Sequence, residues 1–178
     1  DILRPIIFRD NDSYIKVTPS NNMIINYTIV YDHKLIKEQN FTFHLDTQYN
    51  YTNLICNSRT FGFKEEVEFL RKRGLIAGGS LDNAIVLDNE GIMNKSALRH
   101  DDEFVRHKVL DFIGDIYLLG YRVRGSFEIF KGGHRLTHEL AKSIMSDKSN
   151  WKFIDEKSDI EELAFSTSNH KKELSASL

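Results

Sequence analysis

The sequence predicts an α+β domain in which a mixed, mainly antiparallel sheet packs against two helices and carries a small β-α-β insertion. Short apolar or alternating runs, separated by polar turns, fill the first 45 residues and are typical of antiparallel strands. Two later segments repeat apolar residues at helical spacing and are long enough to cover a sheet. A third helical segment lies between two strand-like runs, at about residues 60–88, and predicts the insertion.

Four strands are expected before residue 46, because each apolar run there is bounded by turn residues. These strands cover residues 6–9, 14–18, 23–31 and 41–45. The next stretch, 47–57, has no clear period, and a short helix is one interpretation of it. Within the insertion we expect a charged amphipathic helix over 64–73, which Gly74 ends, and a strand over 83–88.

The longest predicted helix covers 103–119 and ends at Gly120, and the acidic residues 101–103 place negative charge at its N-terminus, where the helix dipole favours it. A strand over 123–130 and a last helix over 134–145 follow. We therefore expect one domain over 1–146. The polar tail 147–178 is expected to lie mostly outside it, with Trp151 and Phe153 as candidates for docking.

Bulk composition excludes several classes of protein. The net charge of −2 gives no global attraction to nucleic acid, and no apolar run reaches the roughly 20 residues that a transmembrane helix needs. A single cysteine, Cys56, excludes an intrachain disulfide and favours a cytoplasmic location. The start at Asp1 without a methionine suggests a fragment of a longer chain. Five Asn-x-Ser/Thr sequons are interpreted as chance occurrences, at Asn11, Asn26, Asn40, Asn50 and Asn94.

The helix over 103–119 has two distinct faces. Its apolar face consists of Val105, Val109, Phe112, Ile113 and Ile116. His107, Lys108, Asp111 and Asp115 fall together on the other side, within an arc of about 100°. His107 and Asp111 are four residues apart, and their side chains suit Zn²⁺. A solvated polar face held by ion pairs remains an open alternative, because one helix supplies only two of the three protein ligands that a catalytic zinc takes.

Two other segments carry candidate catalytic residues. His134 follows two glycines at a helix start, where it suits a general acid with Asp115 as its partner, or simply begins the helix. Thr60 precedes a glycine-containing turn, where its hydroxyl can stabilise an oxyanion or serve a structural role. The remaining histidines are treated as surface or packing residues: His33, His44, His100, His138 and His170.

These motifs, taken in order, resemble the C-terminal domain of the zinc-dependent UDP-3-O-acyl-N-acetylglucosamine deacetylases of lipid A biosynthesis in Gram-negative bacteria. The matching stretches are Arg-Thr-Phe-Gly-Phe at 59–63, Arg-Gly-Leu-Ile-Ala-Gly-Gly-Ser at 73–80, Asn-Ala-Ile-Val at 83–86, Asp-Glu-Phe-Val-Arg-His-Lys-Val-Leu-Asp at 102–111, Ile-Gly-Asp at 113–115 and Gly-His at 133–134. Each motif is weak alone, whereas the ordered set over about 85 residues is specific.

The resemblance implies a role for each candidate. His107 and Asp111 become ligands of a Zn²⁺ cofactor, and Lys108 contacts the polar head of the substrate. Thr60 stabilises the oxyanion, and His134, held by Asp115, protonates the departing amine. An apolar passage for the acyl chain is implied within the insertion, lined by Phe61, Val67, Leu70, Ile76, Ser80, Leu81 and Val86.

The sequence also departs from the family pattern. The family's third zinc ligand and general base form a Glu-His pair in the N-terminal domain, and no Glu-His dipeptide occurs here. The substrate UDP-3-O-acyl-N-acetylglucosamine and that N-terminal domain are therefore the expected partners, and the isolated chain is expected to be inactive. Thr137 and His138 replace the amide side chains expected there. Two alternatives stay open: a catalytically silent nucleotide-sugar or acyl-chain binding module, and a structural α+β domain.

Overall fold

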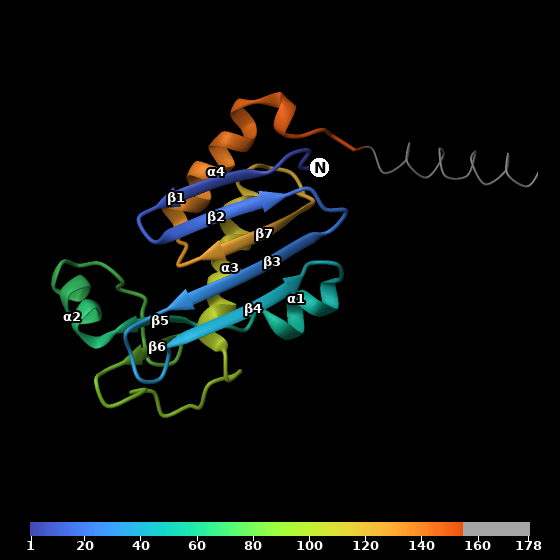
Figure 1. Cartoon of the computed structure of the whole chain (residues 1–178). Helices are drawn as coiled ribbons and strands as arrows, with labels where there is room; N and C mark the ends of the chain where they lie inside the picture. The colour runs from blue at the N-terminus through green and yellow to red at the C-terminus, as the bar shows by residue number, and fades with distance from the viewer. Residues whose placement is uncertain (155–178) are drawn as a thin grey trace, which may run out of the picture.

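The main sheet has five strands in the order β1-β2-β7-β3-β4, in a computed structural model that describes residues 1–154 (Figure 1). The strands are β1 (Ile6–Asp10), β2 (Ser13–Thr18), β3 (Met23–Val30), β4 (Glu38–His44) and β7 (Gly125–Phe130). All neighbours pair antiparallel except β3 and β7, which run parallel. The predicted mixed, mainly antiparallel sheet is confirmed. The segment 155–178, which includes most of the predicted tail and His170, lies outside the described residues.

The alternation along β3 separates the core from the outer face of the sheet. Met23, Ile25, Tyr27 and Ile29 are buried, and the residues between them face outward. Two of the Asn-x-Thr sequons lie opposite each other on this outer face, because residues two apart on a strand share a side. Asn26 Nδ2 donates a hydrogen bond to Thr42 Oγ1, and Asn40 Nδ2 donates one to Thr28 Oγ1. Each bond has a length of 2.7 Å. These polar side chains therefore pair across β3 and β4.

Two helices, α3 (Glu103–Tyr117) and α4 (His134–Ser146), cover the inner face of the sheet (Figure 1). The predicted apolar face of α3 is buried throughout, and Phe112 packs on Phe127 of β7 with ring centroids 5.0 Å apart. Burial of this face contributes much of the stability of the fold, since burying each Val, Ile or Phe side chain contributes about 1.5–3 kcal/mol to the free energy of unfolding. The ambiguous stretch after β4 forms a short helix, α1 (Gln48–Leu54).

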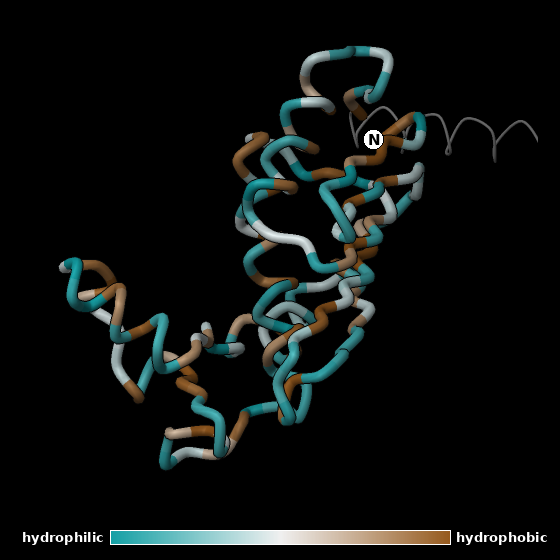
Figure 2. Tube along the Cα trace, turned by 60° about the vertical axis from the view of Figure 1, so that its left-hand side comes forward, coloured by the Kyte–Doolittle hydropathy of each residue, from teal (hydrophilic) through white to brown (hydrophobic). Residues whose placement is uncertain are grey.

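The insertion is a separate lobe made of β5 (Thr60–Phe63), α2 (Lys64–Lys72) and β6 (Ala84–Leu87). Strands β5 and β6 pair parallel, as a β-α-β unit requires, and Figure 2 shows the lobe extending away from the sheet and its helices. Gly74 has a φ of 72°, which explains why a glycine ends α2.

Residues after 146 continue to pack on the domain. The 3-10 helix η1 (Lys148–Asn150) follows α4, and Trp151 forms a bridge with Ile2 beside the start of the chain. Phe153 packs on Trp151 and Tyr121, with ring centroids 4.8 Å apart in each case. Trp151 and Phe153, the candidates for docking, thus both contact residues of the domain, and Phe153 is 62% exposed.

A buried ion pair joins the insertion to the N-terminus of α3. Glu103 was expected to act as a helix-end charge, but its side chain is 0% exposed. Its two carboxylate oxygens accept hydrogen bonds from Nε and Nη2 of Arg59, each with a length of 2.9 Å. Its carboxylate also accepts the backbone N–H groups of Arg59 and Arg99. Burial alone would raise the pKa of Glu103, but these hydrogen bonds lower it to about 2. Sequence pattern missed this pair, because nothing local links positions 44 residues apart.

Replacing Glu103 with glutamine should strongly destabilise the chain, because the buried guanidinium of Arg59 loses its counter-ion. We expect the free energy of unfolding at pH 7 to fall by roughly 3–5 kcal/mol, as when other buried pairs are broken. Urea denaturation measures this, with Glu68→Gln on the exposed face of α2 as the matched control.

The same pair predicts a pH dependence. The folded-state pKa of Glu103 is depressed from 4.5 to about 2, so its contribution is complete above the unfolded value and is lost as the pH falls between them. The parent chain should therefore lose stability more steeply over this window than Glu103→Gln. Equal slopes would show that the glutamate is not held as an ion.

Candidate functional site

The polar stripe of α3 is partly shielded from solvent. The side chains of His107, Lys108 and Asp111 are 14%, 15% and 22% exposed. His107 Nε2 lies 3.3 Å from Asp111 Oδ1, and Lys108 Nζ lies 2.8 Å from Asp111 Oδ2. The structure thus brings together the two predicted metal ligands and the predicted substrate contact. One carboxylate oxygen of Asp111 faces His107, and the other faces Lys108.

The ring of His107 is oriented by a backbone carbonyl. Its Nδ1 lies 3.1 Å from the carbonyl oxygen of Ser58, which can only accept a hydrogen bond, so Nδ1 carries the proton. Nε2 is then the ring nitrogen that faces Asp111. Ser58 directly precedes Arg59 in the chain. The buried pair of Arg59 and Glu103 therefore holds the Ser58 carbonyl in place, and this carbonyl orients the His107 ring.

Asp115 lies one turn further along α3, behind His134. Its Oδ2 is 2.7 Å from His134 Nδ1, which makes the predicted pair. Its other oxygen, Oδ1, is 3.5 Å from Nε2 of His138. Treating His138 as an ordinary surface residue was therefore incomplete. A signal was present in the sequence, since His134 and His138 are four apart and share one face of α4.

His134 is presented by a tight turn after β7. Lys131 has a φ of 50°, and a Cβ placed on Gly132 would lie 2.3 Å from Ile129 Cγ2 and 3.0 Å from the hydroxyl of Tyr27. Gly132 is thus required by close packing. Gly133 has an extended backbone, and a Cβ there meets nothing within 4 Å.

One cavity of about 330 Å³ collects these groups. It is lined by Tyr31, Thr60, Phe61, Gly62, Phe63, Glu66, His107, Lys108, Asp111 and His134. Tyr31 and Glu66 were not singled out from the sequence, because they belong to none of the motifs. Phe63 ends the motif at 59–63 but was given no role there. Burial raises the pKa of Tyr31, with Glu66 and Asp111 adding to the shift, so its hydroxyl stays protonated and can donate.

A second, mainly apolar cavity of about 270 Å³ lies within the insertion. It shares Thr60, Phe61, Gly62 and Glu66 with the first cavity, so the two adjoin. The residues predicted for the passage that line it are Phe61, Val67, Leu70, Ile76, Ser80 and Val86. Leu81 is not among its lining residues, and its side chain is 46% exposed.

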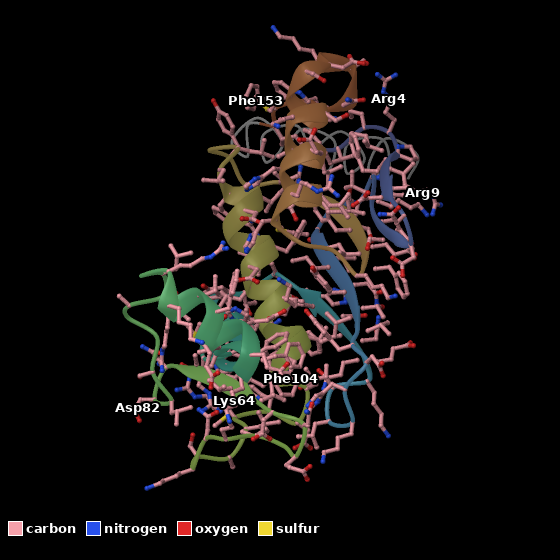
Figure 3. All side chains as sticks on the ribbon, turned by 90° about the vertical axis from the view of Figure 1, so that its left-hand side faces the viewer. Arg4, Arg9, Lys64, Asp82, Phe104 and Phe153 are labelled. Carbon is pink, nitrogen blue, oxygen red and sulfur yellow. The ribbon has the colours of Figure 1, made fainter. Side chains whose placement is uncertain are left out.

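The insertion lies close to the N-terminal end of α3. Figure 3 shows Phe104 at this end of the helix, at the same height as Lys64, where α2 begins. The Phe104 ring meets Phe61 of β5 edge-on, with centroids 5.0 Å apart. This contact seats the root of the insertion against the helix that carries the site.

A family model for UDP-3-O-acyl N-acetylglycosamine deacetylases matches residues 1–146. The chain belongs to this family. The resemblance predicted from the ordered motifs is thereby confirmed. Within residues 1–154, no helix is both long enough and apolar enough to cross a membrane.

Named relatives agree with the family. A UDP-3-O-acyl-N-acetylglucosamine deacetylase of Campylobacter fetus subsp. fetus (strain 82-40) is 44% identical over 153 residues, covering 86% of this chain and 52% of that protein. Proteins of the same name from Sulfurimonas denitrificans and Syntrophus aciditrophicus are 42% and 43% identical, covering 86% and 84% of this chain but 52% and 47% of their own lengths. The chain spans about half the length of these relatives, and the matched half is the C-terminal one.

Gly132→Ala should displace the turn that presents His134, because the new methyl group overlaps Ile129 and Tyr27. We expect a loss of roughly 1–3 kcal/mol of stability, typical of overpacking, and loss of the His134–Asp115 hydrogen bond in NMR spectra of the imidazole. Gly133→Ala is the matched control and should leave both unchanged. If the two variants behaved alike, steric crowding at Gly132 would not be what sets this turn.

Proposed function

We propose that this chain supplies half of the active site of a zinc-dependent hydrolase, which removes the N-acetyl group of UDP-3-O-acyl-N-acetylglucosamine during lipid A biosynthesis. One observation carries the proposal: a single polar cavity collects Thr60, His107, Lys108, Asp111 and His134, and it adjoins an apolar cavity. A substrate with a polar sugar head and an acyl chain needs such a neighbouring pair of cavities.

The donor geometry fits zinc. Two ligands at about 2.0–2.1 Å from a tetrahedral zinc lie about 3.3 Å apart, and His107 Nε2 and Asp111 Oδ1 are 3.3 Å apart. These two residues would hold the ion, and zinc, when bound, would polarise a water and the acetyl carbonyl. Within residues 1–154, no group of three His, Cys, Asp or Glu side chains is arranged to hold a metal ion. A third ligand and the general base would therefore come from the N-terminal half, as the family resemblance implies.

The chain's own residues would do the remaining work. Lys108 brings a positive charge to the cavity and would bind a polar group of the substrate head while keeping Asp111 Oδ2 occupied. Thr60 lines both cavities, and its hydroxyl would stabilise the charge that develops on the acetyl oxygen. His134, whose Nδ1 is held by Asp115, would deliver a proton from Nε2 to the departing amine.

An open groove on the flank of α3 is the surface where we propose that a partner binds. A cavity of about 530 Å³ lies between α1 and α3, with Leu45, Tyr51, Leu110, Ile113 and Tyr117 in its apolar lining. The neighbouring side chain of Leu118 is 75% exposed. Exposed apolar surface of this kind marks an interface, and the N-terminal half of the family proteins is the occupant we propose. The exposed thiol of Cys56 suits the reducing cytoplasm.

The second candidate is a catalytically silent module that binds the nucleotide sugar or its acyl chain. It is favoured by the two-donor metal set within the described residues. The two functions differ in one test: the silent module stays inactive even when joined to a family N-terminal half that carries the Glu-His pair.

This chain alone should release no acetate from UDP-3-O-acyl-N-acetylglucosamine, because it lacks a proton acceptor for the attacking water and a third zinc ligand. Joined to a family N-terminal half, it should show zinc-dependent acetate release. The joined protein with the Glu of the Glu-His pair changed to alanine is the control. Turnover by the isolated chain would show that the base has been misplaced.

In the joined protein, His107→Ala should lose bound zinc, whereas Asp115→Asn should keep it and lower kcat by about 10²-fold or more, the range for an impaired general acid. Metal content by atomic emission and steady-state kinetics give the two readouts. If Asp115→Asn lost zinc as readily as His107→Ala, Asp115 would be a ligand and the division of roles along α3 would be wrong.

A further inference from the structure

Asp115 is approached by two imidazoles, one at each carboxylate oxygen. His134 Nδ1 lies 2.7 Å from Oδ2, and His138 Nε2 lies 3.5 Å from Oδ1. Both histidines belong to α4, one turn apart, and the carboxylate comes from α3 and is 14% exposed. Among residues 1–154, Oδ1 has no other hydrogen-bond or ion-pair partner, so His138 is the polar side chain placed to contact this oxygen, over a longer distance than the hydrogen bond from His134 to Oδ2.

The neighbouring charges on α4 do not compete for this role. Arg135 pairs with Asp10 on β1, and Glu139 pairs with Lys142. On α3, the carboxylate one turn earlier, Asp111, pairs with Lys108. His138 therefore faces Asp115 as its partner within the described residues, with a side chain that is 46% exposed.

A contact at the second oxygen changes what the first can do. An ionised carboxylate is only an acceptor, and a hydrogen bond at one oxygen still allows it to tilt about the Cβ–Cγ bond. A donor at the other oxygen restricts this rotation. The direction in which Oδ2 meets His134 Nδ1 is then defined, and with it the plane of the His134 ring and the aim of its Nε2.

We propose that His138 is a positioning residue, which holds Asp115 at Oδ1 and thereby fixes the orientation of His134. The role in catalysis rests on the proposed deacetylase function, whereas the positioning itself does not. His138 itself lines neither cavity, so it would act only through Asp115 and His134.

The kinetic test uses this chain joined to a family N-terminal half. His138→Ala should lower kcat roughly 10-fold, the lower end of what an outer-shell partner contributes, with KM and zinc content unchanged. His138→Gln should recover most of the loss, because its amide N–H can reach the place of Nε2. His44→Ala, at an exposed histidine on β4, is the matched control and should change nothing.

A double-mutant cycle separates positioning from a merely structural role. If His138 acts through Asp115, the loss caused by His138→Ala should shrink to less than about 2-fold when Asp115 is already asparagine, because coupled residues are not additive. Losses that multiply in the double variant would overturn the proposal. Thermal unfolding of each variant shows whether a loss comes from the fold, and the glutamine variant keeps the test decisive if the alanine variant unfolds.

An NMR measurement tests the inference without turnover or zinc. The Nδ1 proton of His134, hydrogen-bonded to Asp115, should exchange with water measurably faster in His138→Ala than in the parent, and at the parent rate in His138→Gln. An unchanged exchange rate in His138→Ala would refute the positioning role even in an active enzyme. Faster exchange in a protein without deacetylase activity would instead refute the proposed function and leave the positioning role intact.

Discussion

The buried ion pair between Arg59 and Glu103 is the interaction on which the arrangement of the site depends. It joins three separate segments, since Arg59 also donates to Ser96 and to the carbonyl of Ala97. The residues on either side of Arg59 both belong to the site: Ser58 orients His107, and Thr60 lines the two cavities. A charge buried without its partner is strongly unfavourable. The root of the insertion is therefore held in one place relative to α3.

Helix α3 then distributes different tasks along one face. Positions four apart on a helix project in nearly the same direction, so His107, Asp111 and Asp115 form a row beside the cavity wall. Their partners differ: a carbonyl for His107, a lysine for Asp111 and histidines of α4 for Asp115. Partly buried carboxylates need such partners. Because their partners differ, we propose different roles for the two aspartates: Asp111 as a metal ligand and Asp115 as the group that orients His134.

The site has the features that the proposed half of a larger active site needs. It offers two donor atoms at zinc spacing, a candidate general acid and a neighbouring apolar cavity, and beside it the flank of α3 carries an open apolar groove. These features agree with a chain that spans about half the length of its relatives. The insertion and α4 cover the polar stripe from two sides, which keeps its ion pairs partly shielded from water and so strengthens them.

The sequence by itself determined the order of the elements, the apolar face of α3 and the family, because periodicity, turn residues and ordered motifs are local in the chain. Only the tertiary structure decided which elements meet. It placed β7 between β2 and β3, buried Glu103 against Arg59, left Leu81 out of the lining of the insertion cavity and brought His138 to Asp115. Each of these depends on contacts between residues far apart in the chain. Their partners are chosen by packing and by the need to pair buried charge, and a local pattern carries no record of that choice.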